Sequence, residues 1–291
     1  MLRAMAEGSR AVLITGCSSG IGHATASTLL RSGWTVYATA RRPETLSDLE
    51  RAGAHTLALD VTDEASMRAA VDAVTAAEGA VGVLVNNAGY SQSGAVETVP
   101  MDSVRRQFET NVFGLVALTQ MVLPGMREQG WGKIVNVGSM GGRLTFPGGG
   151  FYHATKYALE ALSDALRFEV KGFGIDVVLV EPGLIVTEFG EAATASMSDL
   201  DGSADDPYAT FNASVGALTK GAYDGPMKRL GGGPERVARA IEKAISRGRA
   251  PTRVTVTPSA KLMINTRRLL TDRTWDAAMR GQFPQPGPSR S

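Results

Sequence analysis

Tyr152 and Lys156 are four residues apart, and Ser139 stands thirteen positions before the tyrosine. Residues four apart share one face of a helix, which would place the ammonium of Lys156 beside the phenol of Tyr152. A free tyrosine has a pKa of about 10, and a neighbouring cation favours its phenolate. The pair suits an enzyme that gives a proton to an oxygen or removes one. The same spacing also occurs in helices that merely carry an exposed lysine and a half-buried tyrosine, so the surrounding motifs must decide.

Composition and charge exclude several classes of protein. The 291 residues are 43% hydrophobic, and 30 Lys and Arg stand against 29 Asp and Glu, which gives no global electrostatic case for nucleic acid or an anionic membrane. Cys17 is the single cysteine, and the three histidines are scattered, so we expect neither a disulfide within the chain nor a metal site. Residues 1–10 lack the apolar core of a signal peptide, and no apolar run approaches the ~18 residues of a membrane helix. We therefore expect a cytoplasmic protein with no integral membrane segment.

Short runs rich in β-formers alternate with longer stretches of helical period along most of the chain. The predicted strands are 11–15, 35–39, 55–60, 81–86, 132–138, 175–181 and 253–257. The predicted helices are 22–32, 64–78, 101–128, 152–171 and 234–247. Several strands are nearly continuous in Val, Ile and Leu, which is typical of strands covered on both faces. The pattern predicts an α/β fold: a single-domain, Rossmann-type, doubly wound parallel sheet of about seven strands with helices on both faces.

Nothing in the middle of the sequence resembles a linker, so we expect one catalytic domain over 1–291. Residues 1–9 and 281–291 are expected to be disordered tails, the latter because it is rich in Pro, Gly and Ser. Residues 188–233 form a long insertion before the last predicted helix. We interpret this segment as a substrate-binding lid that is partly helical.

The first strand runs into Thr15-Gly16-Cys17-Ser18-Ser19-Gly20-Ile21-Gly22, and a helix follows. Glycines allow a tight turn and a close approach of the backbone to a ligand, and the start of a helix attracts a pyrophosphate. The same residues also contain G-x-S-x-G, the nucleophile elbow of an α/β-hydrolase. That alternative needs a histidine late in the chain, and none follows His153. We therefore favour dinucleotide binding.

Together these motifs strongly resemble the classical short-chain dehydrogenase/reductase family, over about residues 11–257. The motifs that carry the resemblance are the Gly-rich turn, Asn86-Asn87-Ala88-Gly89, Asn111, Ser139, Tyr152 with Lys156, and Pro182-Gly183-Leu184-Ile185-Val186-Thr187. The turn and the end of the second strand look most like the branch that contains 17β-hydroxysteroid and retinol dehydrogenases.

The resemblance implies a role for each catalytic candidate. Tyr152 would be the general acid or base, Lys156 would hold the nicotinamide ribose and favour the tyrosinate, and Ser139 would bind the substrate oxygen. Asn111 would anchor a water in the proton relay. The cofactor-binding residues implied are Gly16, Ser18, Ser19, Gly20, Ile21, Gly22, Arg41, Asp60, Val61, Asn87, Ala88, Gly89, Tyr152, Lys156, Pro182, Gly183, Ile185 and Thr187.

The end of the second predicted strand indicates which nicotinamide is used. An acidic residue there binds the ribose hydroxyls of NAD, whereas an arginine accommodates the 2′-phosphate of NADP. Ala40 stands where NAD-dependent members of the family carry aspartate, and Arg41 follows it. A guanidinium can bind a phosphate through two charge-assisted hydrogen bonds, with the Ser18 hydroxyl nearby. We predict NADP(H), with solvated loop arginines as the alternative.

The resemblance implies a small lipophilic carbonyl or alcohol substrate. Candidate pocket residues are Met140, Leu144, Phe146, Phe151, Phe189 and Met197. The alternatives are an NADP-binding regulatory protein of the same fold with little or no turnover, or an NAD-preferring alcohol dehydrogenase. Family members commonly pair through the helices that follow strands four and five, so we expect a homodimer, with a tetramer as the alternative.

Overall fold

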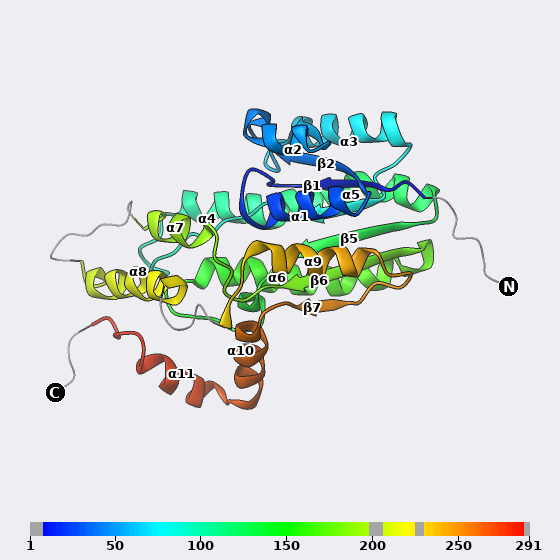
Figure 1. Ribbon diagram of the computed structural model, residues 1–291. Helices are drawn as coiled ribbons and strands as arrows, with labels where there is room; N and C mark the ends of the chain where they lie inside the picture. The colour runs from blue at the N-terminus through cyan, green and yellow to red at the C-terminus, as the bar shows by residue number, and fades with distance from the viewer. Residues whose placement is uncertain (1–7, 198–205, 225–229, 288–291) are drawn as a thin grey trace.

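A parallel sheet of seven strands forms the centre of the molecule (Figure 1). The computed structural model describes residues 8–197, 206–224 and 230–287. The strand order is β3-β2-β1-β4-β5-β6-β7. The strands are β1 Ala11–Ile14, β2 Thr35–Ala40, β3 His55–Ala58, β4 Val83–Asn86, β5 Gly132–Val137, β6 Ile175–Glu181 and β7 Arg253–Thr255. This arrangement confirms the predicted fold class, and each predicted strand is present.

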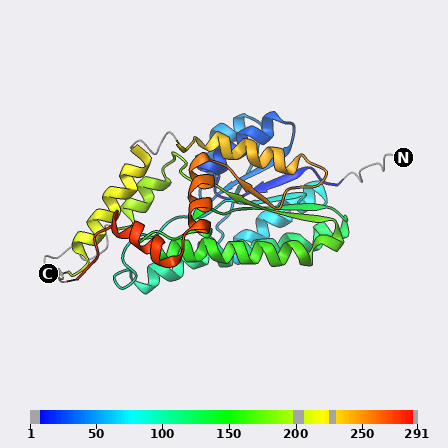
Figure 2. The same cartoon turned by 90° about the horizontal axis from the view of Figure 1, so that it is seen from below.

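Side chains on the two faces of the sheet enter two separate cores, because successive residues of a strand point to opposite faces. In β1, Val12 and Ile14 pack with helices α1 (Gly20–Arg31) and α9 (Pro234–Ile245). Leu13 faces the other core, which includes α3 (Glu64–Glu78) and α5 (Gly114–Glu128). Seen from below in Figure 2, the helices form a layer on each side of the sheet.

The helix predicted over 101–128 has an interruption in its middle. It consists of α4 (Met101–Phe108), a π-helical turn (Glu109–Phe113) and α5. The helix predicted over 152–171 begins two residues earlier, as α6 (Gly150–Glu169). Helices α2 (Ser47–Arg51), α10 (Pro258–Leu269) and α11 (Asp272–Arg280) lie outside the predicted helices.

The two ends of the segment predicted as a lid lie side by side. Ile185 forms a parallel bridge with Gly232, and the Val186 N–H donates to the Gly232 carbonyl over 2.9 Å. Between these points lie α7 (Phe189–Ala195) and α8 (Ala209–Asp224). The rest of the insertion, residues 198–205 and 225–229, falls outside the described residues. The two helices and the C-terminal helices α10 and α11 gather at one end of the molecule, away from the N-terminus (Figure 1).

The C-terminal helices have a small core of their own. Leu144 and Ile264 are buried there with Trp275 and Met279, and Phe283 packs against the same cluster. Of the predicted tails, residues 8, 9 and 281–287 are described and 1–7 and 288–291 are not. Within the described residues, no helix is long and apolar enough to cross a membrane.

Candidate active site

The Gly-rich turn after β1 is fastened to the end of β4. The Thr15 hydroxyl accepts the N–H groups of Asn87 and Ala88, each over 2.9 Å. The Asn87 amide donates to the carbonyls of Thr15 and Gly16 over 2.9 and 3.0 Å. A Cβ on Gly22 would collide with the Gly16 carbonyl and the Asn87 amide. The turn can therefore close only around a glycine at position 22.

The start of helix α1 fits an anionic group. Gly16 and Gly20 have φ angles of +71° and +58°, a conformation that glycine adopts without strain. The Ser19 side chain makes no capping hydrogen bond, and the first turn of the helix holds no acidic residue. Unpaired N–H groups at such a helix start bind phosphate. The residues present therefore fit the pyrophosphate of a dinucleotide.

Four further predicted cofactor contacts, Ser18, Arg41, Asp60 and Val61, follow the ends of β1, β2 and β3. Arg41 is exposed directly after β2, and Ser18 is exposed on the Gly-rich turn, whose Cys17 N–H donates to the Thr39 carbonyl at the end of β2. One carboxylate oxygen of Asp60 accepts hydrogen bonds from the Thr62 N–H and hydroxyl, at 2.9 and 2.7 Å. Asp60 thus orders its own turn, next to the buried Val61.

Helix α6 carries Tyr152 and Lys156 in its first two turns. The Lys156 Nζ lies 5.8 Å from the centroid of the Tyr152 ring and donates to the Val137 carbonyl over 2.9 Å. Lys156 is 7% exposed, and this burial lowers its pKa from 10.5 to about 8. A lysine in this state is still largely a cation at neutral pH, as the sequence reasoning requires.

Ser139 stands two residues after the end of β5 and begins a connection to α6 that we call the Ser139 loop, residues 139–149. Its hydroxyl oxygen accepts the Gly141 N–H over 3.0 Å, which leaves the hydroxyl proton available to a substrate oxygen. The Met140 N–H donates to the Pro182 carbonyl over 2.8 Å, so the loop is also tied to the end of β6.

Asn111 lies in the π-helical turn and is buried. Its amide donates to the Tyr90 carbonyl and the Thr155 hydroxyl over 2.9 and 3.2 Å, and its oxygen accepts the Tyr90 N–H over 3.1 Å. A Cβ on Gly89 would lie 3.1 Å from the Asn111 Oδ1 and 4.0 Å from the Lys156 Nζ. The structure thus brings Asn111, Gly89 and Lys156 together, and the Asn111 side chain fixes the loop after β4.

The residues after β6 close the other side of the site. A Cβ on Gly183 would collide with the hydroxyls of Thr257 and Ser259. The Thr187 methyl lies 3.5 Å from the position of a Cβ on Gly20, which places Thr187 against the Gly-rich turn. Ile185 is buried and bridges to Gly232. The segment Pro182–Thr187 therefore contacts the turn that fits a pyrophosphate.

A partly buried ionic cluster includes Arg143 of the Ser139 loop. Arg143 reaches Glu181 at 3.2 Å and Glu160 at 3.7 Å, and Arg253 of β7 binds Glu160 at 3.0 Å and Asp164 at 2.6 Å. Burial, together with the charge of Glu181, raises the pKa of Glu160 to about 7. The cluster joins the loop to α6, β6 and β7.

Five of the six pocket residues predicted from the sequence divide into two groups, and the sixth, Phe151, is half-buried in the first turn of α6. The Phe189 ring lies 5.5 Å from the Tyr152 ring, and Met197 packs with Phe211. Leu144 is instead fully buried under α10 and α11, where Met140 and Phe146 also pack. Sequence reasoning missed the apolar cavity beside α8 and the contacts of His153 with the Ser139 loop. The cavity has no local signal because its lining comes from four separate parts of the chain, residues 95–97, 147–148, 208–211 and 286, whereas the histidine stands inside the recognised motif.

Comparison with known proteins identifies the family. The short chain dehydrogenase family profile matches residues 10–198. A 3-ketodihydrosphingosine reductase of Bacteroides thetaiotaomicron is 38% identical over 253 residues, covering 87% of this chain and 89% of the relative. An NADPH-dependent 3-dehydrocapnine reductase of Ornithobacterium rhinotracheale is 37% identical over 221 residues, 72% of this chain and 78% of the relative. A short-chain dehydrogenase structure from Streptomyces avermitilis has a TM-score of 0.75 and 35% identity, covering 94% of this chain and 99% of that one. The chain belongs to the short-chain dehydrogenase/reductase family and is an oxidoreductase that acts on CH–OH groups with a nicotinamide cofactor.

Proposed function

We propose that the enzyme interconverts a lipophilic ketone or aldehyde and its alcohol with NADP(H), and that Tyr152 is the general acid or base. The observation that carries the proposal is the position of the buried Lys156 cation, 5.8 Å from the Tyr152 ring. Gly141 lies between Ser139 and the start of α6. A Cβ on Gly141 would be 3.3 Å from the Ser139 Oγ and 2.6 Å from His153, the neighbour of Tyr152.

The reduction follows from these positions. When bound, the dihydronicotinamide supplies the hydride that adds to the carbonyl carbon. Tyr152 donates its phenolic proton to the carbonyl oxygen, on which negative charge develops, and Ser139 donates a hydrogen bond to the same oxygen. Both contacts strengthen as charge builds, so they stabilise the transition state more than the ketone. In the oxidative direction Tyr152 removes the alcohol proton.

The preference for NADP(H) is supported by the end of β2. Ala40 is buried and carries no carboxylate, while Arg41 is exposed beside the Gly-rich turn. An arginine in this place matches the charge and the geometry of a 2′-phosphate. The NADPH-dependent 3-dehydrocapnine reductase, 37% identical, is consistent with this assignment.

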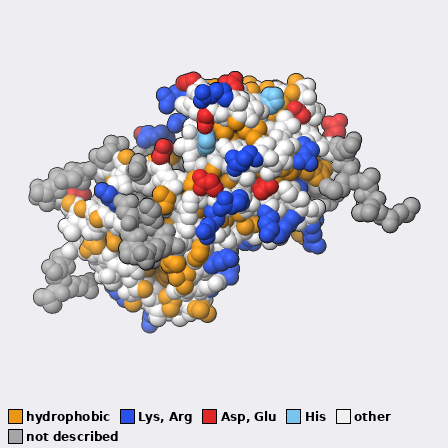
Figure 3. Space-filling view, viewed as in Figure 1, with side chains coloured by type: hydrophobic (Ala, Val, Ile, Leu, Met, Phe, Trp, Pro, Cys, Tyr) orange, Lys and Arg blue, Asp and Glu red, His pale blue; other side chains and the backbone are white. Residues whose placement is uncertain are grey.

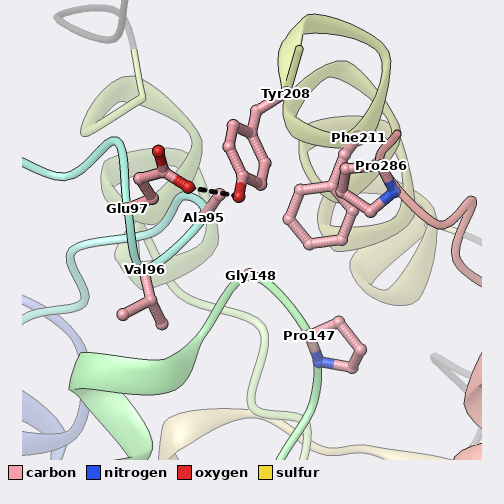
Figure 4. Close-up of a pocket in the computed structure, with 8 residues that line it drawn as sticks. All are labelled: Ala95, Val96, Glu97, Pro147, Gly148, Tyr208, Phe211 and Pro286. Carbon is pink, nitrogen blue, oxygen red and sulfur yellow. Dashed lines mark hydrogen bonds between the residues drawn. The ribbon is translucent and has the colours of Figure 1, made fainter. Parts of the chain in front are cut away.

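A lipophilic substrate is supported by an apolar cavity of about 440 Å³ beside helix α8, shown in Figure 4. Pro147 and Gly148 of the Ser139 loop line this cavity, whereas Ser139 and Tyr152 do not. Phe211 and Pro286 line one side of it, and Val96 and Pro147 line another. A second cavity of about 490 Å³ adjoins it and extends under Trp275 and Met279. Both volumes lie in the usual range for small-molecule sites. The names of the two relatives also describe reduction of a keto or dehydro group at carbon 3.

The test is NADPH consumption with a series of ketones of increasing alkyl chain length. Each buried methylene contributes about 0.8 kcal/mol, so kcat/KM rises up to roughly fourfold per methylene until the apolar space is filled. Tyr152→Phe lowers kcat by about 10²- to 10⁴-fold, because the proton donor is lost, and leaves NADPH binding unchanged. Tyr157→Phe on the exposed part of the same helix is the control. Full activity of Tyr152→Phe contradicts the mechanism, and a flat chain-length profile contradicts the lipophilic substrate.

We also propose that two copies of the chain pair through α5 and α6. Phe113, at the end of the π-helical turn before α5, and Tyr157 and Phe168 of α6 are large apolar side chains that are exposed at 55%, 44% and 87%. Tyr157 and Phe168 are eleven residues apart, so they share a face of α6. Exposed apolar side chains on one helix face favour an isologous interface.

A further inference from the structure

His153 follows Tyr152 directly, and its imidazole is buried at 6% exposure. Its Nδ1 lies 2.9 Å from the Gly141 carbonyl oxygen, and its Nε2 lies 3.1 Å from the Phe146 backbone nitrogen. Both partners belong to the Ser139 loop. The side chain therefore connects the first turn of α6 to two points of the loop that carries Ser139.

These partners fix the protonation state of the ring. A carbonyl oxygen only accepts a hydrogen bond and a backbone N–H only donates one, so Nδ1 carries the proton and Nε2 is the acceptor. The imidazole is then neutral. Burial lowers the pKa of His153, which also favours the neutral ring. Both ring nitrogens are satisfied, which a charged or flipped ring does not achieve here.

One residue, Gly141, separates this ring from Ser139. The Gly141 N–H donates to the Ser139 Oγ over 3.0 Å, and the Gly141 carbonyl accepts the proton of His153 Nδ1. The two bonds are made by the peptide groups on either side of the Gly141 Cα. Gly141 is therefore held on one side by the serine hydroxyl and on the other by the imidazole.

The loop is shaped around the ring. A Cβ on Gly141 would lie 2.6 Å from the His153 Nδ1, and a Cβ on Gly149 would lie 2.8 Å from Nε2. The imidazole also lies between two aromatic rings, with centroids 5.7 Å from Tyr152 and 5.9 Å from Phe146. The two glycines thus leave the space that the ring occupies.

We propose that His153 is a positioning residue, which holds the Ser139 loop against α6 so that Ser139 and Tyr152 address the same substrate oxygen. The inference rests on the proposed roles of these two residues in carbonyl reduction. A histidine that only filled the core would not need both ring nitrogens on the loop. It would also not bond to Gly141, the residue whose N–H donates to the Ser139 hydroxyl.

Three variants separate the two contacts. His153→Leu removes both, and lowers kcat for ketone reduction by about 10- to 100-fold, as expected for a small misplacement of catalytic groups. The affinity for NADPH is unchanged, because the Gly-rich turn and Arg41 are untouched. His153→Asn keeps a donor near the position of Nδ1, and His153→Gln keeps an acceptor near Nε2. Asn recovers more of kcat than Gln, since only the Nδ1 contact leads to Ser139.

Hydrogen exchange of residues 140–149, measured by mass spectrometry, provides a readout that does not need a substrate. Exchange accelerates in His153→Leu and returns toward the wild-type rate in His153→Asn. His55→Leu is the matched control, because His55 lies on the edge strand β3 and stacks on Tyr37. It leaves kcat and the exchange of the loop unchanged.

Two results overturn the proposal: a folded His153→Leu enzyme with wild-type kcat and wild-type loop exchange, or equal recovery by Asn and Gln. A wild-type enzyme that reduces no ketone refutes the proposed function instead. In that case the exchange rates still decide whether His153 holds the loop.

Discussion

At the scale of single residues, burial lowers the pKa of Lys156 and so limits the pH range in which its amine is charged. Its amine lies beside the Tyr152 ring and donates to a backbone carbonyl, and burial lowers its pKa to about 8. A lysine is a cation below its pKa, so the charge that favours the tyrosinate is present below about pH 8 and is lost above it.

This pKa predicts two pH profiles. The value of kcat/KM for ketone reduction, which reports the free enzyme, falls above about pH 8. Between about pH 8 and pH 10.5, the ordinary pKa of lysine, Lys156 is protonated in the unfolded chain and deprotonated in the native chain. The free energy of unfolding therefore rises with pH in this window. The gain is about 3 kcal/mol by the conversion of pKa shifts to free energy. Urea titrations of the wild type and Lys156→Met across the window measure it, and identical slopes contradict the prediction.

Arg41 determines a second prediction at this scale. Arg41→Ala raises the KM for NADPH about 10- to 100-fold, because a charge-assisted contact to the 2′-phosphate is lost, and leaves the KM for NADH nearly unchanged. Initial rates with both cofactors measure the ratio. Arg42→Ala, the exposed neighbour, is the control. An unchanged ratio in Arg41→Ala would show that the arginine is a solvated loop charge.

At the scale of elements, the Gly-rich turn is held by β4 as well as by its own glycines. Thr15 and Asn87 exchange four hydrogen bonds with the turn and the end of β4, all between 2.9 and 3.0 Å. This arrangement gives Asn87 a structural role in addition to the cofactor contact that the family resemblance implies. The turn therefore has its shape without a bound cofactor.

Asn87→Ala tests this arrangement. The Thr15 and Gly16 carbonyls lose their donor, so the free energy of unfolding falls by about 1–3 kcal/mol and the KM for NADPH rises. Thermal unfolding and initial rates measure the two effects together. Asn265→Ala on the exposed face of α10 changes neither. A loss of stability without a change in KM would show that the turn keeps its shape without Asn87.

At the scale of the whole molecule, the cavities gather at one end. Figure 3 shows charged side chains over the body around α2 and α9, on the face seen there. Hydrophobic side chains are also visible toward the end with the C-terminal helices. That end also contains both apolar cavities. None of the exposed side chains of the proposed pairing face, Phe113, Tyr157 and Phe168, lines either cavity.

The proposed interface predicts the mass in solution. Light scattering gives twice the chain mass of 30.6 kDa for the wild type and 30.6 kDa for Tyr157→Asp/Phe168→Asp, because two charges enter an apolar contact. Leu269→Asp on α10, a site 86% exposed, is the control and remains a dimer. Dissociation by Leu269→Asp would place the interface on the C-terminal helices, and a monomeric wild type would refute the pairing.

The sequence by itself determined the order of the elements and the catalytic motif. Strand runs such as Val83–Asn86 and the helical period of Glu64–Glu78 are local patterns of burial, so they could be read without tertiary information. The π-helical turn at Asn111 could not be predicted, because the apolar period of the sequence does not change there. What marks the turn is the pair of hydrogen bonds from Asn111 to Tyr90 and Thr155. Helices α10 and α11 were not predicted, because their apolar stripes are short. Their burial depends on the packing of Trp275 and Met279 against Leu144, which is distant in the sequence.

Only the tertiary structure decided which polar groups are partners. The sequence placed Ser139, Tyr152 and Lys156 in one motif. It did not show that His153 bonds to Gly141 and Phe146, or that Asn87 holds the Gly-rich turn. It also did not show that C-terminal residues line the second cavity. These contacts join distant or irregular segments. Periodicity reports which face of an element is buried. It does not report what a buried group touches, because that depends on how the elements pack.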